Sequence, residues 1–464
     1  MRQIGVILLA AGQGTRMKSS VPKVLHPLAG KPLLLHALGV AKRLKPSAIA
    51  VVIGHGAGAI RDAYVDKDVT WVIQEQQLGT GHAVLCAKNN FADFCGDILI
   101  LSGDAPLIQE RTLTAMIQAH SDREAAVTLM TAFLDRPTGY GRILRDPRGD
   151  ITGIVEEKDA TVEQQQIQEV TAGVYVAAPQ FLFTVLEEVK NDNRQGEYYL
   201  PDIVTIGLGQ GKKIAAFRVD DPREMMGINT REELARMEKT LQERINRRWM
   251  DAGVTLEDPQ TTYIEEAVTI GRDTVIGPNS HLRGRTVLGE RCHIDGSAYL
   301  TDAQIGDEVY LKFSVVLTSC RVDRGAIIGP FAHLRPGTSL GPNVHIGNFV
   351  ETKEAHLGEG TKANHLTYLG DVTIGRDSNI GAGTITCNYD GFKKYRTQIG
   401  DRVQVGSDST LVAPISLGDD VYVATATTIR HDIPAGALVF NERQERLREG
   451  WTEEKRKQMK GIKK

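Results

Sequence analysis

A glycine-rich segment with two basic residues stands near the N-terminus. It runs Gly12-Gln13-Gly14-Thr15-Arg16-Met17, and Lys23 follows directly after Pro22. Small residues let backbone N–H groups approach phosphate oxygens, whose charge Arg16 and Lys23 can neutralise. No Gly-Lys-Ser/Thr ends the segment as in a Walker loop, and the Gly-x-Gly-x-x-Gly of dinucleotide binding is missing. The segment is therefore either a phosphate-binding loop of another kind or a plain glycine turn with two solvated bases.

Two further polar segments follow expected strands. The first, Gln74–His82, carries amide and hydroxyl groups that suit hydrogen bonding to the edge of a base. The second, Ser102-Gly103-Asp104, places a carboxylate at the edge of the sheet where α/β proteins bind ligands. An aspartate in such a place is more often part of a turn or a helix cap. Beside a phosphate-binding loop it becomes a candidate ligand of Mg²⁺, which takes one or two protein oxygens together with phosphates and waters.

Basic and polar residues gather again between positions 329 and 379. Arg335 and Lys353 are three six-residue repeats apart, and His365, Tyr368 and Asn379 follow soon after. Two basic side chains suit a sugar phosphate, and the imidazole of His365 suits taking a proton from an attacking amine. A lone surface histidine is usually inert, so the clustering is what makes His365 a candidate general base.

A six-residue repeat must position this second group. From about Val268 to Asp432 an aliphatic residue recurs every six positions, often followed by glycine as in Ile270-Gly271. Neither a helix nor a plain strand has this period. A short strand plus a corner has it, with the aliphatic side chain inside a narrow prism and glycine at the turn. Three repeats make one coil, which predicts a parallel β-helix of about nine coils. The segment 386–396 interrupts the repeat and is predicted to leave one edge as a binding loop.

Alternating strand and helix patterns must position the first group. Continuous apolar runs at 4–9, 48–53, 69–73 and 97–101 indicate strands buried on both faces, and 33–44 has the pattern of a helix. This order predicts a mostly parallel sheet with helices on both faces. Residues 231–252 carry apolar positions at helical spacing among charges and are predicted to form a stiff linker helix.

Composition narrows the class of protein. The 464 residues carry a net charge of −3, so no excess of basic residues points to nucleic acid. Five cysteines without ligand spacing favour free thiols in a reducing compartment. The sequence shows no signal peptide and no apolar run long enough to span a bilayer, which predicts a soluble cytoplasmic protein. The basic end of the chain, 455–464, is expected to be a solvated, mobile tail.

The string Gly12-x-Gly14-Thr15-Arg16-Met17-x4-Pro22-Lys23 resembles the signature of sugar-phosphate nucleotidyltransferases. The whole chain, with both halves in this order, resembles the bacterial bifunctional N-acetylglucosamine-1-phosphate uridyltransferase/glucosamine-1-phosphate N-acetyltransferase family. The resemblance implies an α/β Rossmann-like nucleotidyltransferase domain followed by a parallel β-helix, which is left-handed in hexapeptide-repeat acyltransferases. It also implies three parts: a uridyltransferase domain over 1–230, the linker helix over 231–252, and an acetyltransferase domain with its tail over 253–464.

For the first half, the resemblance implies that Arg16 and Lys23 are catalytic and that Asp104 and Asn229 hold Mg²⁺. Asn229 has an alternative role in a helix-capping turn, because Thr230 and Glu233 have capping-box spacing. The family usually has Asn where this chain has Thr171, and a hydroxyl can replace one amide contact but not two. The implied substrate contacts, with Gln74, Gly79 and Thr80 against uracil, are Leu9, Ala10, Ala11, Gly12, Lys23, Gln74, Gly79, Thr80, Ser102, Gly103, Asp104, Gly141, Glu156, Thr171 and Asn229.

For the second half, the resemblance implies that His365 is the general base. Arg335, Lys353, Tyr368 and Asn379 then bind the sugar phosphate, and the implied acetyl-CoA contacts are Ala382, Asn388, Tyr389, Ser407, Thr425 and Arg443. Two positions depart from the family. Thr425 replaces an alanine, and Glu442 replaces the arginine that meets the coenzyme's phosphates. Either Arg443 or a nearby base takes that role, or coenzyme binding is weakened.

These expectations predict a two-step enzyme that uses glucosamine 1-phosphate, acetyl-CoA, UTP and Mg²⁺ and makes UDP-N-acetylglucosamine for cell-wall synthesis. A homotrimer is expected from the same resemblance, with the acetyl-CoA site at a subunit interface. Two alternatives stay open. The β-helix could be only an oligomerisation or regulatory scaffold for a single nucleotidyltransferase activity. The first half could instead serve another sugar or nucleotide, because Gln74 and the segment after it favour uracil without excluding thymine.

Overall fold

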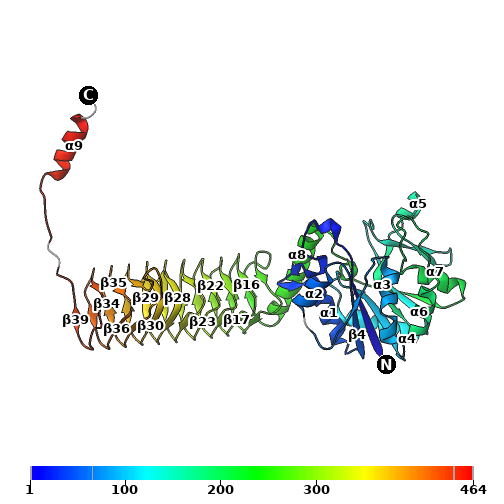
Figure 1. Cartoon of the computed structure of the whole chain (residues 1–464), viewed down its shortest axis with the longest axis horizontal. Helices are drawn as coiled ribbons and strands as arrows, with labels where there is room; N and C mark the ends of the chain where they lie inside the picture. The colour runs from blue at the N-terminus through cyan, green and yellow to red at the C-terminus, as the bar shows by residue number, and fades with distance from the viewer. Residues whose placement is uncertain (1–2, 65, 443–444, 462–464) are drawn as a thin grey trace. The chain divides into compact units, whose positions relative to one another are not determined.

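The computed structural model describes residues 3–64, 66–442 and 445–461. The chain forms two compact units, Met1–Arg244 and Ile245–Lys464, and the boundary falls inside the long helix α8 (Arg231–Asp251) (Figure 1). Each unit has its own architecture. Within the described residues, no helix is long and apolar enough to cross a membrane.

The first unit is built on one mixed sheet. Its main strands run in the order β11-β7-β10-β6-β1-β4-β5. All neighbours on this path pair in parallel except β10, which is antiparallel to β6 and β7 and also pairs with the antiparallel β8–β9 hairpin. The expected parallel sheet is thus present but interrupted by one reversed strand. The strands are β1 (Ile4–Ala10), β4 (Ala48–Ile53), β5 (Thr70–Ile73), β6 (Asp97–Ser102), β7 (Val127–Phe133), β8 (Gly141–Arg145), β9 (Ile151–Val155), β10 (Glu169–Ala177) and β11 (Ile214–Arg218).

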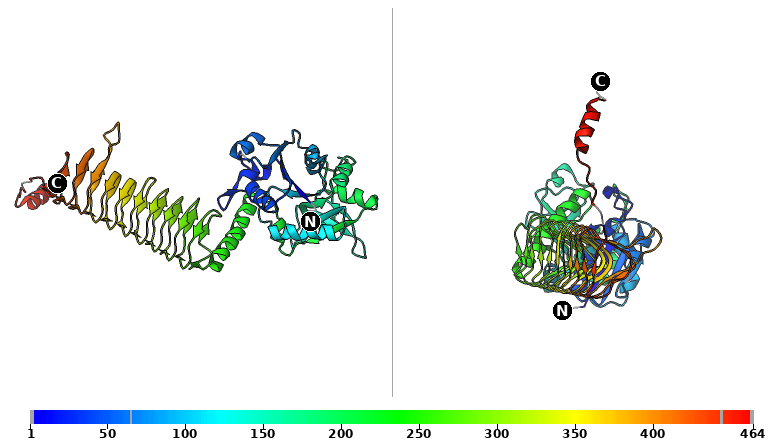
Figure 2. Two further views of the ribbon diagram at one scale, coloured as in Figure 1. Left: turned by 90° about the horizontal axis from the view of Figure 1, so that it is seen from below. Right: turned by 90° about the vertical axis from the view of Figure 1, so that its left-hand side faces the viewer.

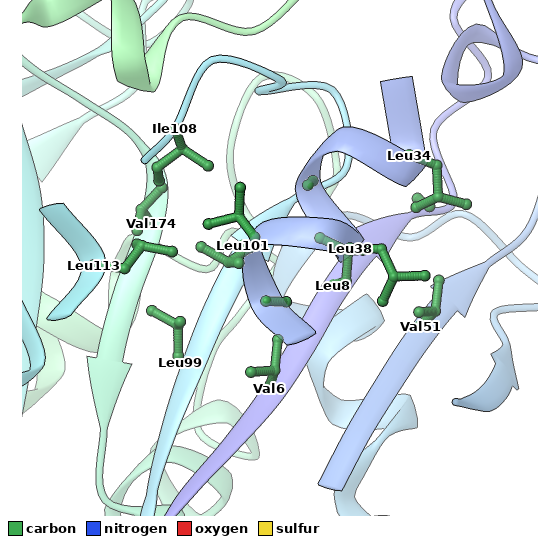
Figure 3. Packing of buried hydrophobic residues seen from close by; sticks show 14 of the residues in the cluster. Val6, Leu8, Leu34, Leu38, Val51, Leu99, Leu101, Ile108, Leu113 and Val174 are labelled. Atoms are coloured by element: carbon green, nitrogen blue, oxygen red, sulfur yellow. The ribbon is translucent and has the colours of Figure 1, made fainter. Parts of the chain in front are cut away.

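Helices cover both faces of this sheet, because successive strand side chains point to opposite sides. Val6 and Leu8 of β1 belong to one buried cluster, whereas Ile7 belongs to another. The first cluster includes residues of α1 (Leu33–Arg43) and α4 (Glu110–Asp122), and Figure 3 shows Leu34, Leu38 and Leu113 packed on the strands. The second includes residues of α3 (Thr80–Cys86), α6 (Pro179–Leu186) and α7 (Asp202–Gly209). Shorter helices are α2 (Ala57–Ala63) and α5 (Val162–Gln165).

The second unit is the predicted parallel β-helix. One sheet stacks eleven short strands from β12 (Thr255–Leu256) to β39 (Leu438–Val439), and a seventeen-stranded sheet wraps the other two faces. The repeat anchors are buried: Ile270 pairs with Leu288, and Ile276 with Ile294, in neighbouring coils. Figure 2 shows the coils stacked on one another. The stack extends beyond both ends of the predicted repeat, so it holds more coils than the nine expected.

Two details at the edges of the β-helix concern the predicted loop and the tail. Residues 388–396 leave the stack between β32 (Ile385–Cys387) and β33 (Thr397–Ile399), which confirms the predicted insertion (Figure 2). Near the end of the chain, helix α9 (Trp451–Gly461) covers part of the tail expected over 455–464. Residues 451–460 are exposed, which agrees with the expected solvation, and residues 462–464 lie outside the described part of the chain. Acidic residues in the first turn of α9 and Lys460 in its last turn are placed to stabilise the helix dipole.

Candidate functional sites

A cavity of about 610 Å³ lies at the carboxyl ends of β1, β5 and β6. This volume is within the usual range for small-molecule sites, and the position is where α/β sheets bind ligands. Gly103 lies directly behind it, where its N–H donates to the Leu9 carbonyl oxygen over 2.8 Å. The other predicted residues of the first half all line the cavity: Leu9, Ala10, Ala11, Gly12, Arg16, Lys23, Gln74, Gly79, Thr80, Ser102, Asp104, Gly141, Glu156, Thr171 and Asn229.

The cavity wall holds a cluster of four polar residues around the Lys23–Asp104 ion pair. The Lys23 ammonium donates to an Asp104 carboxylate oxygen and, over 3.0 Å, to the Asn229 amide oxygen. The Ser102 hydroxyl donates to the other Asp104 oxygen over 2.5 Å. Burial opposes ionisation of Asp104, but the Lys23 charge and these hydrogen bonds outweigh it, so the pKa of Asp104 lies below its ordinary value. Asp104 is therefore a carboxylate at neutral pH.

The same cluster shows that Asp104 and Asn229 can suit a metal ion. A carboxylate oxygen and an amide oxygen converge on one cation, the Lys23 ammonium, which stands in for an ion at that point. Such oxygens are the ligands that Mg²⁺ prefers, with phosphates and waters completing its shell. Asp104 and Asn229 therefore fit the predicted magnesium ligands.

Local structure holds both oxygens in place. The Asp104 carbonyl accepts from the Ile228 N–H over 3.0 Å, which ties the loop after β6 to the segment before α8. Thr230 and Glu233 form the expected capping box, and the Glu233 carboxylate also accepts from the Asn229 N–H over 2.6 Å. Asn229 thus belongs to a capping turn while its side-chain amide reaches Lys23, so the two alternative roles coexist.

A left-handed glycine allows Lys23 to reach the cluster. Gly14 has φ +63°, and a Cβ there would lie 2.6 Å from the Lys23 Cβ. A larger residue would push Lys23 away and would also be strained at this φ value. The glycine-rich loop therefore makes a close contact with Lys23. Arg16 lies on the short helix that follows the loop (Thr15–Met17).

Another part of the cavity wall carries a partly desolvated carboxyl and two buried hydroxyls. Burial, helped by the charges of Asp202, Asp159 and Glu197, raises the pKa of Glu156 to about 7. The Thr171 and Tyr175 hydroxyls are buried and interact with each other, with no other hydrogen-bond partner among the described residues. Because each hydroxyl can form more than one hydrogen bond, both can also bind a polar ligand.

Several residues of the cavity wall have no signal in the sequence. Tyr175 points in from β10 and Glu197 comes from the loop before α7, far from every motif. Met225 and Gly227 come from the segment before α8. The one available hint was Tyr140, which directly precedes the predicted contact Gly141.

A second group of polar residues lies on one face of the β-helix. His333 pairs with Glu351, so Arg335 and Lys353 stack on successive coils as their spacing predicts. Lys353 pairs with Gly370, which lies on the next coil. Arg335 is bonded to the Glu351 carboxylate over 2.8 Å. The ammonium of Lys394, from the insertion, lies beside Lys353 and lowers its pKa, with Arg335 adding to the effect. The insertion therefore adds one more basic residue to this cluster.

Gly370 makes room for two polar side chains. A Cβ at Gly370 would lie 2.4 Å from the Tyr368 hydroxyl and 2.8 Å from the Asn388 amide nitrogen. That Asn388 nitrogen donates to the Asp371 carboxylate. The structure thus brings together Arg335, Lys353, Tyr368 and Asn388. Tyr389 is exposed on the insertion, while Asn379 lies on another sheet, where it pairs with Lys362.

A corner of the prism carries His365 and three of the six expected coenzyme contacts. His365 is two residues after Ala363, which pairs with Ile380, and the same register continues to Val405 and Val423. His365, Ala382, Ser407 and Thr425 therefore form one column, spaced about 4.8 Å apart from coil to coil. His365 is exposed, three residues before Tyr368. Glu442 is also exposed, and Arg443 lies outside the described residues.

Comparisons with known proteins cover both units. The model of the MobA-like NTP transferase domain matches residues 6–197, and models of hexapeptide-repeat transferases match residues 267–302 and 396–429. These matches agree with the predicted nucleotidyltransferase domain and left-handed β-helix. The bifunctional GlmU protein of Pelobacter propionicus is 46% identical over 97% of this chain and 98% of its own length.

Two further relatives give the same result. The GlmU protein of Geotalea uraniireducens is 47% identical over 97% of this chain and 99% of its own length. That of Geobacter sulfurreducens is 46% identical over 99% of this chain and 100% of its own length. The resemblance noted in the sequence is thereby confirmed, and the chain belongs to the family of bifunctional GlmU proteins.

Proposed function

We propose that this chain catalyses two consecutive transfers at two separate sites. The second unit moves an acetyl group from acetyl-CoA to the amine of glucosamine 1-phosphate. The first unit then joins the resulting N-acetylglucosamine 1-phosphate to UTP and releases pyrophosphate. The main support for the proposal is one observation. Oxygens of Asp104 and Asn229 converge on the Lys23 cation inside a cavity at the carboxyl edge of the sheet. That arrangement suits the polyphosphate of a nucleotide.

In the uridyl transfer, this chain mainly binds, orients and neutralises. Arg16 and Lys23 bind phosphate oxygens, and Glu156 and Thr171 bind hydroxyls of the sugar in another part of the cavity. The sugar phosphate then lies in line with the α-phosphorus of UTP, and pyrophosphate leaves on the opposite side. Asp104 and Asn229 would hold Mg²⁺, which would supply positive charge to the phosphate oxygens. No protein nucleophile is required, because positioning and charge lower the barrier.

In the acetyl transfer, the β-helix surface holds the sugar phosphate beside a base. Arg335 and Lys353 bind the phosphate, with Tyr368 of the same copy and Asn379 of a neighbouring copy on the sugar. His365 takes a proton from the attacking amine, and the coenzyme thiolate leaves as the tetrahedral adduct collapses. The coenzyme runs along the corner column from Ala382 to Thr425. Three coil spacings separate His365 from Thr425, about 14 Å, which suits an extended thioester arm.

We also propose a cytoplasmic homotrimer in which the acetyl-transfer site lies between copies. An apolar row on the same corner of the β-helix supports this. Phe331 and Phe349 stack with ring centroids 5.3 Å apart, Phe313 meets Phe331 edge-on at 6.1 Å, and Leu366 follows one coil later. All four are exposed in the single chain, and bulky residues at positive φ, such as Phe349, are unusual. A second copy would cover this row next to His365.

The proposal is tested by incubating the enzyme with glucosamine 1-phosphate, acetyl-CoA, UTP and Mg²⁺ and following the products by mass. We expect N-acetylglucosamine 1-phosphate to appear first, followed by UDP-N-acetylglucosamine. If supplied N-acetylglucosamine 1-phosphate is uridylated while glucosamine 1-phosphate is never acetylated, the β-helix is only a scaffold. Replacing UTP by dTTP in a parallel reaction tests the nucleotide preference.

A further inference from the structure

Three side chains form a connected row at the base-binding end of the cavity. The Gln74 side-chain nitrogen, Nε2, lies 3.1 Å from the Gly79 carbonyl oxygen and 3.0 Å from His82 Nδ1. On the other side of the imidazole ring, His82 Nε2 lies 3.9 Å from the Cys86 sulfur. Gln74 is almost fully buried, lines the cavity, and follows directly after β5.

The Gly79 carbonyl oxygen determines how the Gln74 amide is oriented. A carbonyl oxygen only accepts hydrogen bonds, so the Gln74 atom that faces it must be the nitrogen. One hydrogen of that nitrogen goes to Gly79, and the second goes to His82 Nδ1, which must therefore be unprotonated. The ring proton then lies on Nε2, directed toward the Cys86 sulfur. One tautomer of His82 satisfies all these contacts.

Fixing the nitrogen also fixes the amide oxygen. Both hydrogens of the Gln74 amide are used inside the protein, and its Oε1 accepts no hydrogen bond from any residue that the structure describes. Oε1 is the group left available toward the cavity. We propose that His82 is a positioning residue that holds Gln74 as a hydrogen-bond acceptor, so that the site selects pyrimidines carrying an N3–H and rejects cytosine. This proposal rests on the proposed uridyl transfer.

The selectivity follows from the edges of the bases. Uracil presents N3–H as a donor, which pairs with an acceptor at Gln74. Cytosine presents an unprotonated N3, so two acceptors would face each other there. Without the acceptor at His82 Nδ1, only the Gly79 carbonyl holds the Gln74 amide in this orientation. The amide then turns over at a smaller cost and can present its NH₂ group to cytosine N3. Thymine also carries N3–H, so this contact does not separate thymine from uracil.

The backbone around the row is held tightly, so a change at His82 can act on Gln74 without moving the loop. Gly79 has φ +114°, and a Cβ there would lie 2.6 Å from the Tyr198 carbonyl oxygen. Tyr198 also receives the Gly81 N–H at that oxygen and donates its own N–H to the Leu78 carbonyl, each over 2.8 Å. These backbone bonds do not involve the imidazole ring.

The test compares two substitutions of similar size. His82→Asn keeps an acceptor, Oδ1, near the place of Nδ1, whereas His82→Leu has none. For each purified variant, kcat/KM is measured with UTP and with CTP, using N-acetylglucosamine 1-phosphate and Mg²⁺. His120→Leu is the matched control, because His120 is a buried histidine that bonds Thr128 and does not line the cavity. The UTP/CTP ratio is read because it does not depend on the fraction of active enzyme.

We expect His82→Leu to lower the UTP/CTP ratio about tenfold or more, the usual cost of one wrong base-edge contact. His82→Asn should keep the ratio within about twofold of wild type, and His120→Leu should leave it unchanged. An unchanged ratio in His82→Leu would overturn the proposal. Equal losses in His82→Leu and His82→Asn would also overturn it, because the ring would then act only through packing. A wild-type enzyme that uses neither nucleotide would instead contradict the proposed uridyl transfer.

Discussion

The cavity of the first unit and the basic cluster of the β-helix both gather charged side chains, but they alter pKa values for different reasons. At Glu156, burial is the main cause of a pKa raised to about 7. At Lys353, the neighbouring Lys394 ammonium is the main cause of a lowered pKa. Desolvation marks a site that one chain encloses by itself. Repulsion between neighbouring like charges marks an open surface that a phosphate would neutralise.

The two folds explain this difference. A parallel sheet brings the ends of several strands to one edge, so loops from distant parts of the chain surround a common space. A β-helix places equivalent residues of successive coils in columns, so its functional groups lie along a face or a corner. Such columns need an insertion or another copy to enclose a substrate. The insertion at 388–396 already brings Lys394 and Asn388 to the basic cluster.

The strongest test of two independent sites is His365→Ala. Loss of a general base should lower acetyl transfer by about 10²–10⁴-fold. The Michaelis constants should change little, because the ring is not proposed to hold either substrate, and uridyl transfer should keep its wild-type rate. Steady-state assays of both half-reactions measure this. Acetyl transfer at the wild-type rate across neutral pH would show that another group takes the proton.

Asp104→Asn is the reciprocal test in the cavity. It removes the charge that faces Lys23 and the proposed metal ion, so uridyl transfer should fall by about 10²–10³-fold, since metal-ion catalysis is worth several kcal/mol. Acetyl transfer by the same preparation should stay near wild type. If both activities fall together, the variant has a folding defect and the assignment of Asp104 to one site is not supported.

Because the second site is open in a single chain, we expect its activity to depend on assembly of the copies. Phe349→Asp places a charge within the exposed aromatic row and should separate the copies. Acetyl transfer should then fall at least about tenfold at low protein concentration and recover as the concentration rises, whereas uridyl transfer per chain should not change. Light scattering gives the assembly state. Val162→Asp, at an exposed apolar position of the first unit, is the control and should affect neither measurement.

The enclosed character of the first site predicts a smaller effect, on stability. The pKa of Glu156 is raised in the folded chain above its ordinary value of 4.5. The folded state therefore favours the protonated form, and stability is lost as pH rises from about 4.5 toward 7. Glu156→Gln should remove this loss and stabilise the first unit at pH 8 by about 1 kcal/mol, less than the full shift because water reaches the cavity.

Urea unfolding of wild type and Glu156→Gln at pH 5 and pH 8 checks this prediction. The advantage of the variant should be small at pH 5 and larger at pH 8. A constant difference at both values would show that burial does not govern Glu156, and the contrast between the two sites would lose its electrostatic basis.

The sequence by itself determined the elements whose contacts are local. The six-residue period identified the β-helix because each anchor, such as Ile270, packs mainly against the neighbouring coils. The position of the insertion followed from the same period. The buried runs gave strand β4 at its observed bounds and β1 and β6 to within one residue, because strands covered on both faces are continuously apolar. Motifs together with the family resemblance identified about half of the residues that line the first cavity.

Only the tertiary structure decided which groups meet. The reversed strand β10 places Thr171 and Tyr175 in the cavity wall. No local sequence pattern predicts the direction of a strand or the pairing of distant segments. The same holds for Lys394 beside Lys353, and for the Gly79 carbonyl that fixes the Gln74 amide against His82. Composition and spacing specify which chemical groups are present. Their hydrogen-bond polarity and pKa values depend on neighbours that long-range packing brings within a few ångströms, and those neighbours are set by the whole fold.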